Sequence, residues 1–331
     1  MHATEEGRVT RLGSRLDRRA LSLHDVLGRW GRRVGPSLAG SRRWYLWFIA
    51  PLTVAILCTS VVPMAILLYF SFTGESSAYF TRPFAGLKEY AYVISDPAFL
   101  ETIRVEVLFV VASLALEMTF GFAIALALRR YTWFSRAVRT LLVAPVVMPV
   151  VVVALLFSFM LQPGLGLVAD LGSLLGLNSA AWLSNGTSAL AVLVGIDVWQ
   201  YTPFVAILLY AGLQGIPPEV LDAAAVDGAG PVRLVRFIYW PMLLPVTLVV
   251  GLLRFVDAVQ VFPTIYVLTS GGPGESTTAL NYWGYLLFFV DQYTGRGSAA
   301  VVILMVGTLV IAGIILWIGL RKFRGLGGGA T

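Results

Sequence analysis

Charged residues, cysteine and histidine are scarce in this sequence of 331 residues. Charged side chains make up 13% of it and hydrophobic side chains 58%, whereas roughly a quarter of a soluble domain is charged. The single cysteine, Cys58, excludes an intrachain disulfide, and both histidines, His2 and His24, lie in the polar N-terminal segment. The apolar body of the chain therefore has no histidine for a metal site or for Ser-His-Asp catalysis.

Long apolar runs fill most of the chain and predict an all-α integral membrane protein. A bilayer core about 30 Å thick needs roughly 20 helical residues. Six runs reach this length: 45–72, 105–128, 140–161, 188–213, 242–268 and 299–320. The chain then divides into a basic N-terminal tail over 1–44, a six-helix membrane domain over 45–320 and a C-terminal tail over 321–331.

The positions of Lys and Arg predict the orientation of these spans. Of the 24 Lys and Arg residues, 19 lie in the two tails and in the loops 129–139 and 214–241. Since basic loops and tails stay in the cytoplasm, both termini are predicted to be cytoplasmic. Topology and attraction to membrane lipid account for the positive net charge, so no nucleic-acid surface is expected. Residues 10–34 of the tail form either an amphipathic helix on the inner leaflet or a disordered basic segment.

The cytoplasmic loop 214–241 predicts two short helices joined by a bend. Two prolines and a glutamate favour the start of a helix that an alanine run continues, and two glycines interrupt it: Pro217, Pro218, Glu219, Gly228 and Gly230. A second helix is expected from Pro231 and is expected to end at Pro241, at the membrane. Such a helix-turn-helix either docks into a groove of a partner protein or is a plain interfacial loop.

A motif in this loop, Asp222-Ala223-Ala224 followed by Asp227-Gly228-Ala229 and then by Pro241, resembles the Glu-Ala-Ala loop of ABC importer permeases. Asp222 stands in the place of the usual Glu. The segments 144–149, 197–204, 211–217 and 266–277 are similar, in order and spacing, to the carbohydrate branch of that family, which includes maltose and glycerol-3-phosphate permeases.

The resemblance implies the type I ABC importer permease fold in the bacterial inner membrane. It implies a non-catalytic subunit that imports a sugar, polyol or glycerol phosphate through a pathway shared with a second homologous permease. The chain has no Gly-rich phosphate loop, so ATP and Mg would bind to two partner ATP-binding subunits, and an extracytoplasmic binding protein would deliver the solute. The 219–229 helix would couple the ATPases to the spans through these loop residues: Glu219, Asp222, Ala223, Ala224, Asp227, Gly228, Ala229 and Pro241.

Ionisable residues within the predicted spans are candidates for function, because a charge at the bilayer centre is costly. They are Glu117, Asp197, Arg254 and Asp257. Arg254 and Asp257 are three residues apart on one helix face and can form a structural pair, and Glu117 is equally open to a structural or a pathway role. In the other interpretation these residues line the solute passage together with amide and aromatic side chains: Trp199, Gln200, Gln260, Asn281 and Tyr282.

Two other classes of protein fit parts of this pattern. An ion-coupled secondary carrier would use Glu117, Asp197 and Asp257 as proton sites, but it would show inverted repeats and would need no docking helix. A membrane-embedded enzyme would need a nucleophile-base pair or a metal motif such as HExxH. The sequence has neither the repeat nor the motif.

Overall fold

A computed structural model describes residues 44–74, 83–129, 133–174, 176 and 182–327. Within these residues the secondary structure is helical, apart from an isolated antiparallel bridge between Thr73 and Phe84. The chain falls into two parts, one ending at Ile66 and one beginning at Leu67. The amphipathic segment proposed for 10–34 lies outside the described residues.

The first apolar run forms α2 (Trp44–Ile56), a π-helical turn (Leu57–Val61) and α3 (Val62–Ser71). Within it, Ile49–Ser71 is long and apolar enough to cross a bilayer. This agrees with the first predicted span, 45–72.

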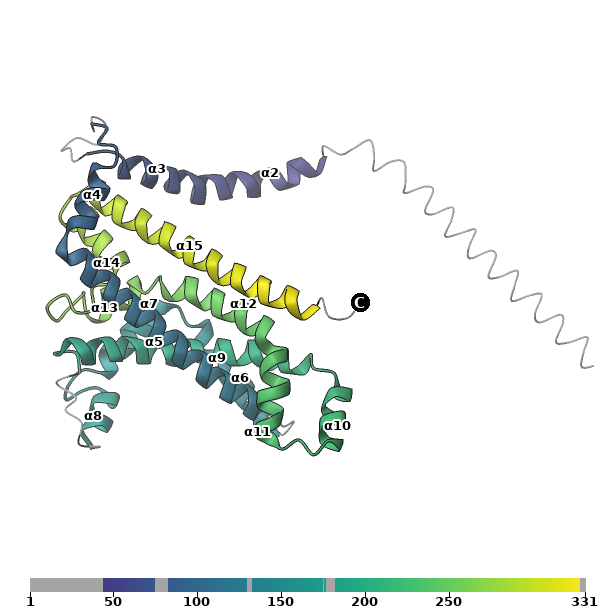
Figure 1. The fold of residues 1–331 in the computed structure, drawn as a ribbon. Helices are drawn as coiled ribbons and strands as arrows, with labels where there is room; N and C mark the ends of the chain where they lie inside the picture. The colour runs from purple at the N-terminus through teal and green to yellow at the C-terminus, as the bar shows by residue number, and fades with distance from the viewer. Residues whose placement is uncertain (1–43, 75–82, 130–132, 175, 177–181, 328–331) are drawn as a thin grey trace, which may run out of the picture. The chain divides into compact units, whose positions relative to one another are not determined.

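Three further predicted spans are confirmed as the single helices α5 (Pro97–Leu128), α9 (Gly186–Gln214) and α15 (Thr294–Gly327). Helix α5 begins well before residue 105, because the Asp96 side chain accepts a hydrogen bond from the backbone N–H of Ala98 and caps the helix, with Pro97 at its first turn. In Figure 1, α5, α9, α12 and α15 run lengthwise, with α13 and α14 at one end and α10 at the other.

The third predicted span, 140–161, is wrong as one continuous helix. It consists of α6 (Trp133–Val147) and α7 (Val150–Met160), which meet at an angle of 97°. Pro149 has extended backbone angles (φ −59°, ψ 137°), and a proline disfavours the helical conformation at the preceding residue, Met148. Counting the bent pair as one span, the described residues contain six candidate spans.

The fifth predicted span, 242–268, is also corrected. A continuous helical segment runs from α11 (Pro231–Leu234) through a π-helical turn (Val235–Tyr239) into α12 (Trp240–Ala258), and α13 (Phe262–Leu268) is separate. Pro241 therefore does not end the second loop helix. The wide turn, in which the Trp240 N–H bonds to the Val235 carbonyl, accommodates this proline, which has no N–H of its own.

Short helices complete the fold: α4 (Lys88–Ser95), α8 (Leu167–Leu174), α10 (Pro218–Val226) and α14 (Leu280–Tyr285), which continues in a π-helical turn (Leu286–Val290). The main packing is between α5 and α9. A Cβ at Gly121 would lie 2.5 Å from Cγ1 of Val205, so the missing side chain lets the two backbones approach closely.

Two hydrophobic cores hold α5, α9 and α12 together. One contains Phe109, Leu193 and Phe255, and the other contains Ala125, Leu209 and Leu243. On each of the three helices one charged residue lies between the stretches that build these two cores: Glu117 on α5, Asp197 on α9 and Arg254 on α12.

Candidate functional site

Arg254 is the centre of a charge cluster made of Glu117, Asp197, Arg254 and Asp257. Its Nε and Nη2 atoms donate to both oxygens of Glu117, over 2.7 and 2.8 Å, and Nη2 also donates to Asp197 over 3.0 Å. Its Nη1 donates to Asp257. The structure thus brings together all four ionisable residues predicted within the spans, and it confirms the Arg254–Asp257 contact.

Burial differs strongly across the charge cluster. The side chains of Arg254 and Glu117 are 1% and 0% exposed, whereas that of Asp257 is 49% exposed. The guanidinium carbon of Arg254 also lies 3.8 Å from the centre of the Tyr201 ring, where a cation is attracted by the ring face. The cluster therefore joins α5, α9 and α12 at its buried side and presents one carboxyl group, that of Asp257, at its open side.

Gln200 and Trp199 lie at the bend between α6 and α7. The Gln200 side chain is 2% exposed, and its Nε2 donates to the Met148 carbonyl over 3.0 Å. This bond satisfies a carbonyl that the helix break at Pro149 leaves without its usual partner. Trp199 packs edge to face against Phe157 with 5.3 Å between ring centres. Gln200 therefore ties α9 to the bend, whereas Trp199 is 42% exposed and adds one aromatic contact.

Gln260 and Asn281 line a cavity of about 530 Å³ that lies between the end of α12, α14 and α15. We call it the amide-lined cavity. Asn281 also donates from Nδ2 to the Val259 carbonyl over 3.0 Å. Tyr282 does not line this cavity, because it is 4% exposed and packs against the rings of Phe262 and Tyr285. Asn281 and Tyr282 belong to helix α14, not to the loop expected there.

The loop motif forms a capped helix, α10. Two hydrogen bonds close its end: Gly228 N–H to the Ala225 carbonyl, and Ala229 N–H to the Ala224 carbonyl. This pair of bonds is the Schellman arrangement, which needs a left-handed residue at the position of Gly228, and Gly228 has φ +69°. Glu219, Asp222, Ala223 and Asp227 are exposed on this helix.

A family model for the inner membrane component of binding-protein-dependent transport systems matches residues 117–324. The chain belongs to this permease family. The trehalose/maltose transport system permease protein MalF of Thermococcus litoralis is 33% identical over 276 residues, which are 83% of this chain and 92% of MalF. The sn-glycerol-3-phosphate permease protein UgpA of Brucella suis is 32% identical over 80% of this chain and 90% of its own length.

A solved bacterial ABC transporter involved in the import of the acidic polysaccharide alginate contains a chain of the same fold. Its TM-score is 0.73 at 22% identity, and the match covers 85% of this permease and 96% of that chain. The predicted all-α importer-permease fold is therefore confirmed. The permease is a multi-pass inner-membrane component of a binding-protein-dependent transport system, and this family assignment replaces the secondary-carrier alternative.

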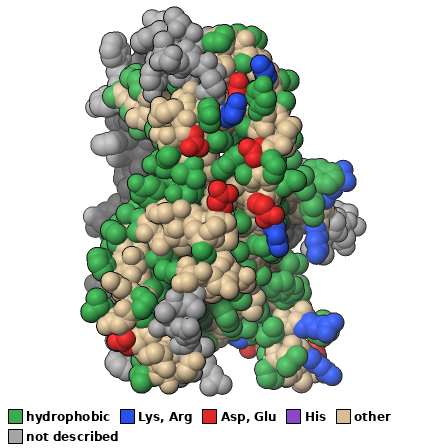
Figure 2. Space-filling model, turned by 90° about the vertical axis from the view of Figure 1, so that its left-hand side faces the viewer, with side chains coloured by type: hydrophobic (Ala, Val, Ile, Leu, Met, Phe, Trp, Pro, Cys, Tyr) green, Lys and Arg blue, Asp and Glu red, His purple; other side chains and the backbone are tan. Residues whose placement is uncertain are grey.

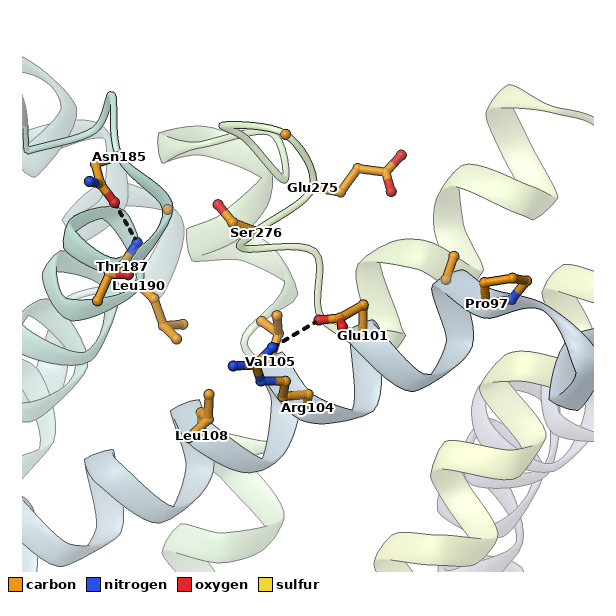
Figure 3. A pocket seen from close by; sticks show the side chains of 13 residues that line it. Pro97, Glu101, Arg104, Val105, Leu108, Asn185, Thr187, Leu190, Glu275 and Ser276 are labelled. Carbon is orange, nitrogen blue, oxygen red and sulfur yellow. Dashed lines mark hydrogen bonds and ion pairs between the residues drawn. The ribbon is translucent and has the colours of Figure 1, made fainter.

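Two features of the permease escaped the sequence prediction. A cavity of about 740 Å³ lies between the N-terminal turns of α5 and α9 and the loop 274–276. Figure 3 shows Glu101 and Arg104 of α5 paired at its edge and Asn185 bonded to the backbone N–H of Thr187. Figure 2, which views the end that carries α13 and α14, shows acidic side chains near the middle of this face.

The second missed feature is Glu106. The second span was predicted to start at 105, which placed Glu106 at its edge, whereas α5 begins at Pro97 and Glu106 lies inside it, 6% exposed. The only available signal was a carboxyl residue within an otherwise apolar run.

Replacing Gln200 with leucine is expected to destabilise the permease by about 1–3 kcal/mol, because the buried Met148 carbonyl loses its donor. The midpoint of thermal unfolding in mild detergent measures this loss. The neighbouring, exposed Trp199→Leu is the control and should change the midpoint less. Equal midpoints for Gln200→Leu and the wild type would contradict a role of Gln200 at the bend.

Proposed function

We propose that this permease is the non-catalytic membrane subunit of an ATP-driven importer of a neutral sugar or polyol. It forms the pathway with a second, homologous permease, and two ATP-binding subunits and an extracytoplasmic binding protein complete the transporter. Its termini face the cytoplasm. The observation that carries the proposal is the family match over 117–324, with relatives named as trehalose/maltose and glycerol-3-phosphate permeases.

Coupling to the ATPases is proposed to pass through α10 and the turn after it. The helix is short, rigid and closed by the Gly228 cap, and it lies at the end of the assembly opposite to α13 and α14 (Figure 1). Val226 and Val232 flank the turn and are 89% and 78% exposed. Exposed apolar side chains beside a rigid helix suit docking into a groove of a partner, which supports the docking interpretation of this loop.

The solute class is proposed from the chemistry of the charge cluster and the amide-lined cavity. Three carboxyl groups surround the single guanidinium of Arg254, and the half-exposed Asp257 would repel an anion. This favours a neutral sugar or polyol over glycerol phosphate. The amides of Gln260 and Asn281 supply the donors and acceptors that hydroxyl groups need.

The test is purification of the tagged permease from its host in mild detergent, followed by reconstitution of the co-purifying subunits in vesicles. We expect an ATP-binding subunit and a second permease in the eluate, and ATP-dependent uptake of the sugar that the binding protein carries. Neutral sugars, polyols and glycerol phosphate are then compared as substrates. A permease that purifies without any ATPase would contradict the importer, and uptake of glycerol phosphate alone would contradict the solute class.

A further inference from the structure

Helix α14 starts inside the protein without a cap of its own. The residue before its first turn, Ala279, is 0% exposed and has no side chain that could accept a hydrogen bond. The first backbone N–H groups of a helix have no partner within the helix, and a buried N–H without a partner is costly. The start of α14 therefore needs an acceptor from elsewhere in the chain.

Glu106 supplies this acceptor from α5. Its Oε2 accepts a hydrogen bond from the backbone N–H of Leu280, the first residue of α14, over 3.1 Å. Glu106 is 6% exposed and lines an apolar cavity of about 330 Å³, in which it is the ionisable residue among the lining side chains. Little water reaches this bond, and a hydrogen bond in such a low-dielectric setting is stronger than one in water.

The same short helix carries Asn281, which lines the amide-lined cavity. Asn281 is tied on its other side to the Val259 carbonyl, at the end of the helix that carries Arg254. Gly284, one turn along α14 from Asn281, packs close to α15, where a Cβ built on it would lie 2.8 Å from Val301, and Trp283 packs in the hydrophobic cluster with Ala299 and Ala300 of α15. The first turn of α14 is thus held between three long helices, and Glu106 makes its contact with α5.

We infer that Glu106 is a positioning residue: it caps α14 from α5 and so fixes Asn281 at the amide-lined cavity. In this positioning role Glu106 does not need to touch the solute. The capping of α14 by Glu106 is inferred from the geometry alone, whereas its effect on transport rests on the proposed function.

Capping is tested by amide hydrogen exchange on the complete transporter. In Glu106→Leu we expect amides in the segment 279–282 to exchange about tenfold faster, because the loss of a cap costs about 1 kcal/mol or somewhat more. Glu106→Gln keeps an accepting oxygen and should stay within about twofold of the wild type. Glu106→Asp keeps the charge but shortens the reach, so it should exchange faster than Glu106→Gln. Glu101→Leu, on the same helix but exposed, is the matched control.

A local cap should rescue the variant. Ala279 has φ −78° and ψ 163°, the backbone region that N-cap residues adopt, so Ala279→Ser can place its own oxygen at the helix start. In the Glu106→Leu background this change should return exchange at 279–282 toward the wild-type rate. Three results would each overturn the inference: unchanged exchange in a folded Glu106→Leu, faster exchange confined to α5, or no effect of the added serine. If Glu106→Leu does not assemble, the exchange rates at 279–282 in Glu106→Asp and Glu106→Gln are compared instead. Exchange that is not faster in Glu106→Asp than in Glu106→Gln would overturn the inference.

Transport kinetics provide the second measurement. Glu106→Leu should raise the solute concentration for half-maximal uptake about fivefold, with a smaller change in the maximal rate, and Ala279→Ser should reverse this. Equal half-saturation in the wild type and in Glu106→Leu would overturn the link to Asn281. If the wild-type complex imports no sugar or polyol, the proposed function fails, and the exchange experiment still decides the capping.

Discussion

Replacing Arg254 with leucine is expected to have the largest effect of any single change in the spans: the permease loses about 3–5 kcal/mol of stability, because Glu117 stays fully buried without its cation. Arg254 bonds from α12 to α5 and α9 at once, so the packing of these three helices at the charge cluster is lost with it. We expect uptake to fall below about a tenth of the wild-type rate. Heating in mild detergent followed by size-exclusion chromatography measures the loss of folded protein.

A double variant separates the structural interpretation of this cluster from the pathway interpretation. Removing both partners of a buried ion pair is much less costly than removing one, so Arg254→Leu combined with Glu117→Leu should recover much of the thermal stability. A purely structural cluster would then recover uptake as well. A cluster that also lines the passage would leave uptake low in the stable double variant.

Arg254→Lys and Arg104→Leu serve as controls for these variants. Lysine keeps the charge of Arg254 but loses the two-pronged contact with Glu117, so it should give an intermediate stability. Arg104→Leu removes an exposed arginine of α5, whose ion pair is 70% exposed, and should change little. Equal stability of Arg254→Leu and Arg104→Leu would contradict the assignment of Arg254 as the centre of the cluster.

Local patterns were sufficient to predict the elements that depend on near neighbours in the chain. The apolar runs predicted the number of candidate spans, although two of the runs are broken or shifted, and the prolines, alanines and glycine of 217–228 predicted α10 and its end. The spacing of Arg254 and Asp257 predicted their contact. The bend at Pro149 was also open to prediction, because a proline within an apolar run disfavours a straight helix, but the run was assigned as one span.

Contacts between distant segments could not be predicted from one sequence. Glu117 lies 137 positions from Arg254, and Leu280 lies 174 positions from Glu106. Nothing in the neighbourhood of Glu117 indicates an arginine, and an alanine before α14 gives no sign of where its cap comes from. Gln200 was predicted to line the solute passage because it is an amide within a span, and its partner, the Met148 carbonyl at the bend, is 52 positions away in the chain.

Replacing Gly228 with aspartate is expected to separate the permease from its ATPases while leaving its own fold intact. Gly228 has φ +69°, and a Cβ built there meets no atom of the described part of the chain within 4 Å. Aspartate is among the residues that tolerate this backbone region, so the variant should insert and fold normally. We expect the amount of co-purifying ATP-binding subunit to fall about tenfold, because charge and bulk enter a closely docked surface.

Matched variants test whether the loss of ATP-binding subunit comes from contact between a partner protein and the position of Gly228. Gly228→Asn has nearly the same shape and backbone tolerance without the charge, so it should retain more ATPase than Gly228→Asp. Gly164→Asp is a control in the turn between α7 and α8: Gly164 has φ +76° and equally open space around a built Cβ, and this variant should bind ATPase normally. A Cβ at either position meets no atom of the described residues within 4 Å, so a loss of ATPase seen only at Gly228 indicates contact with another protein. Normal ATPase binding and uptake by Gly228→Asp would contradict the coupling role of α10.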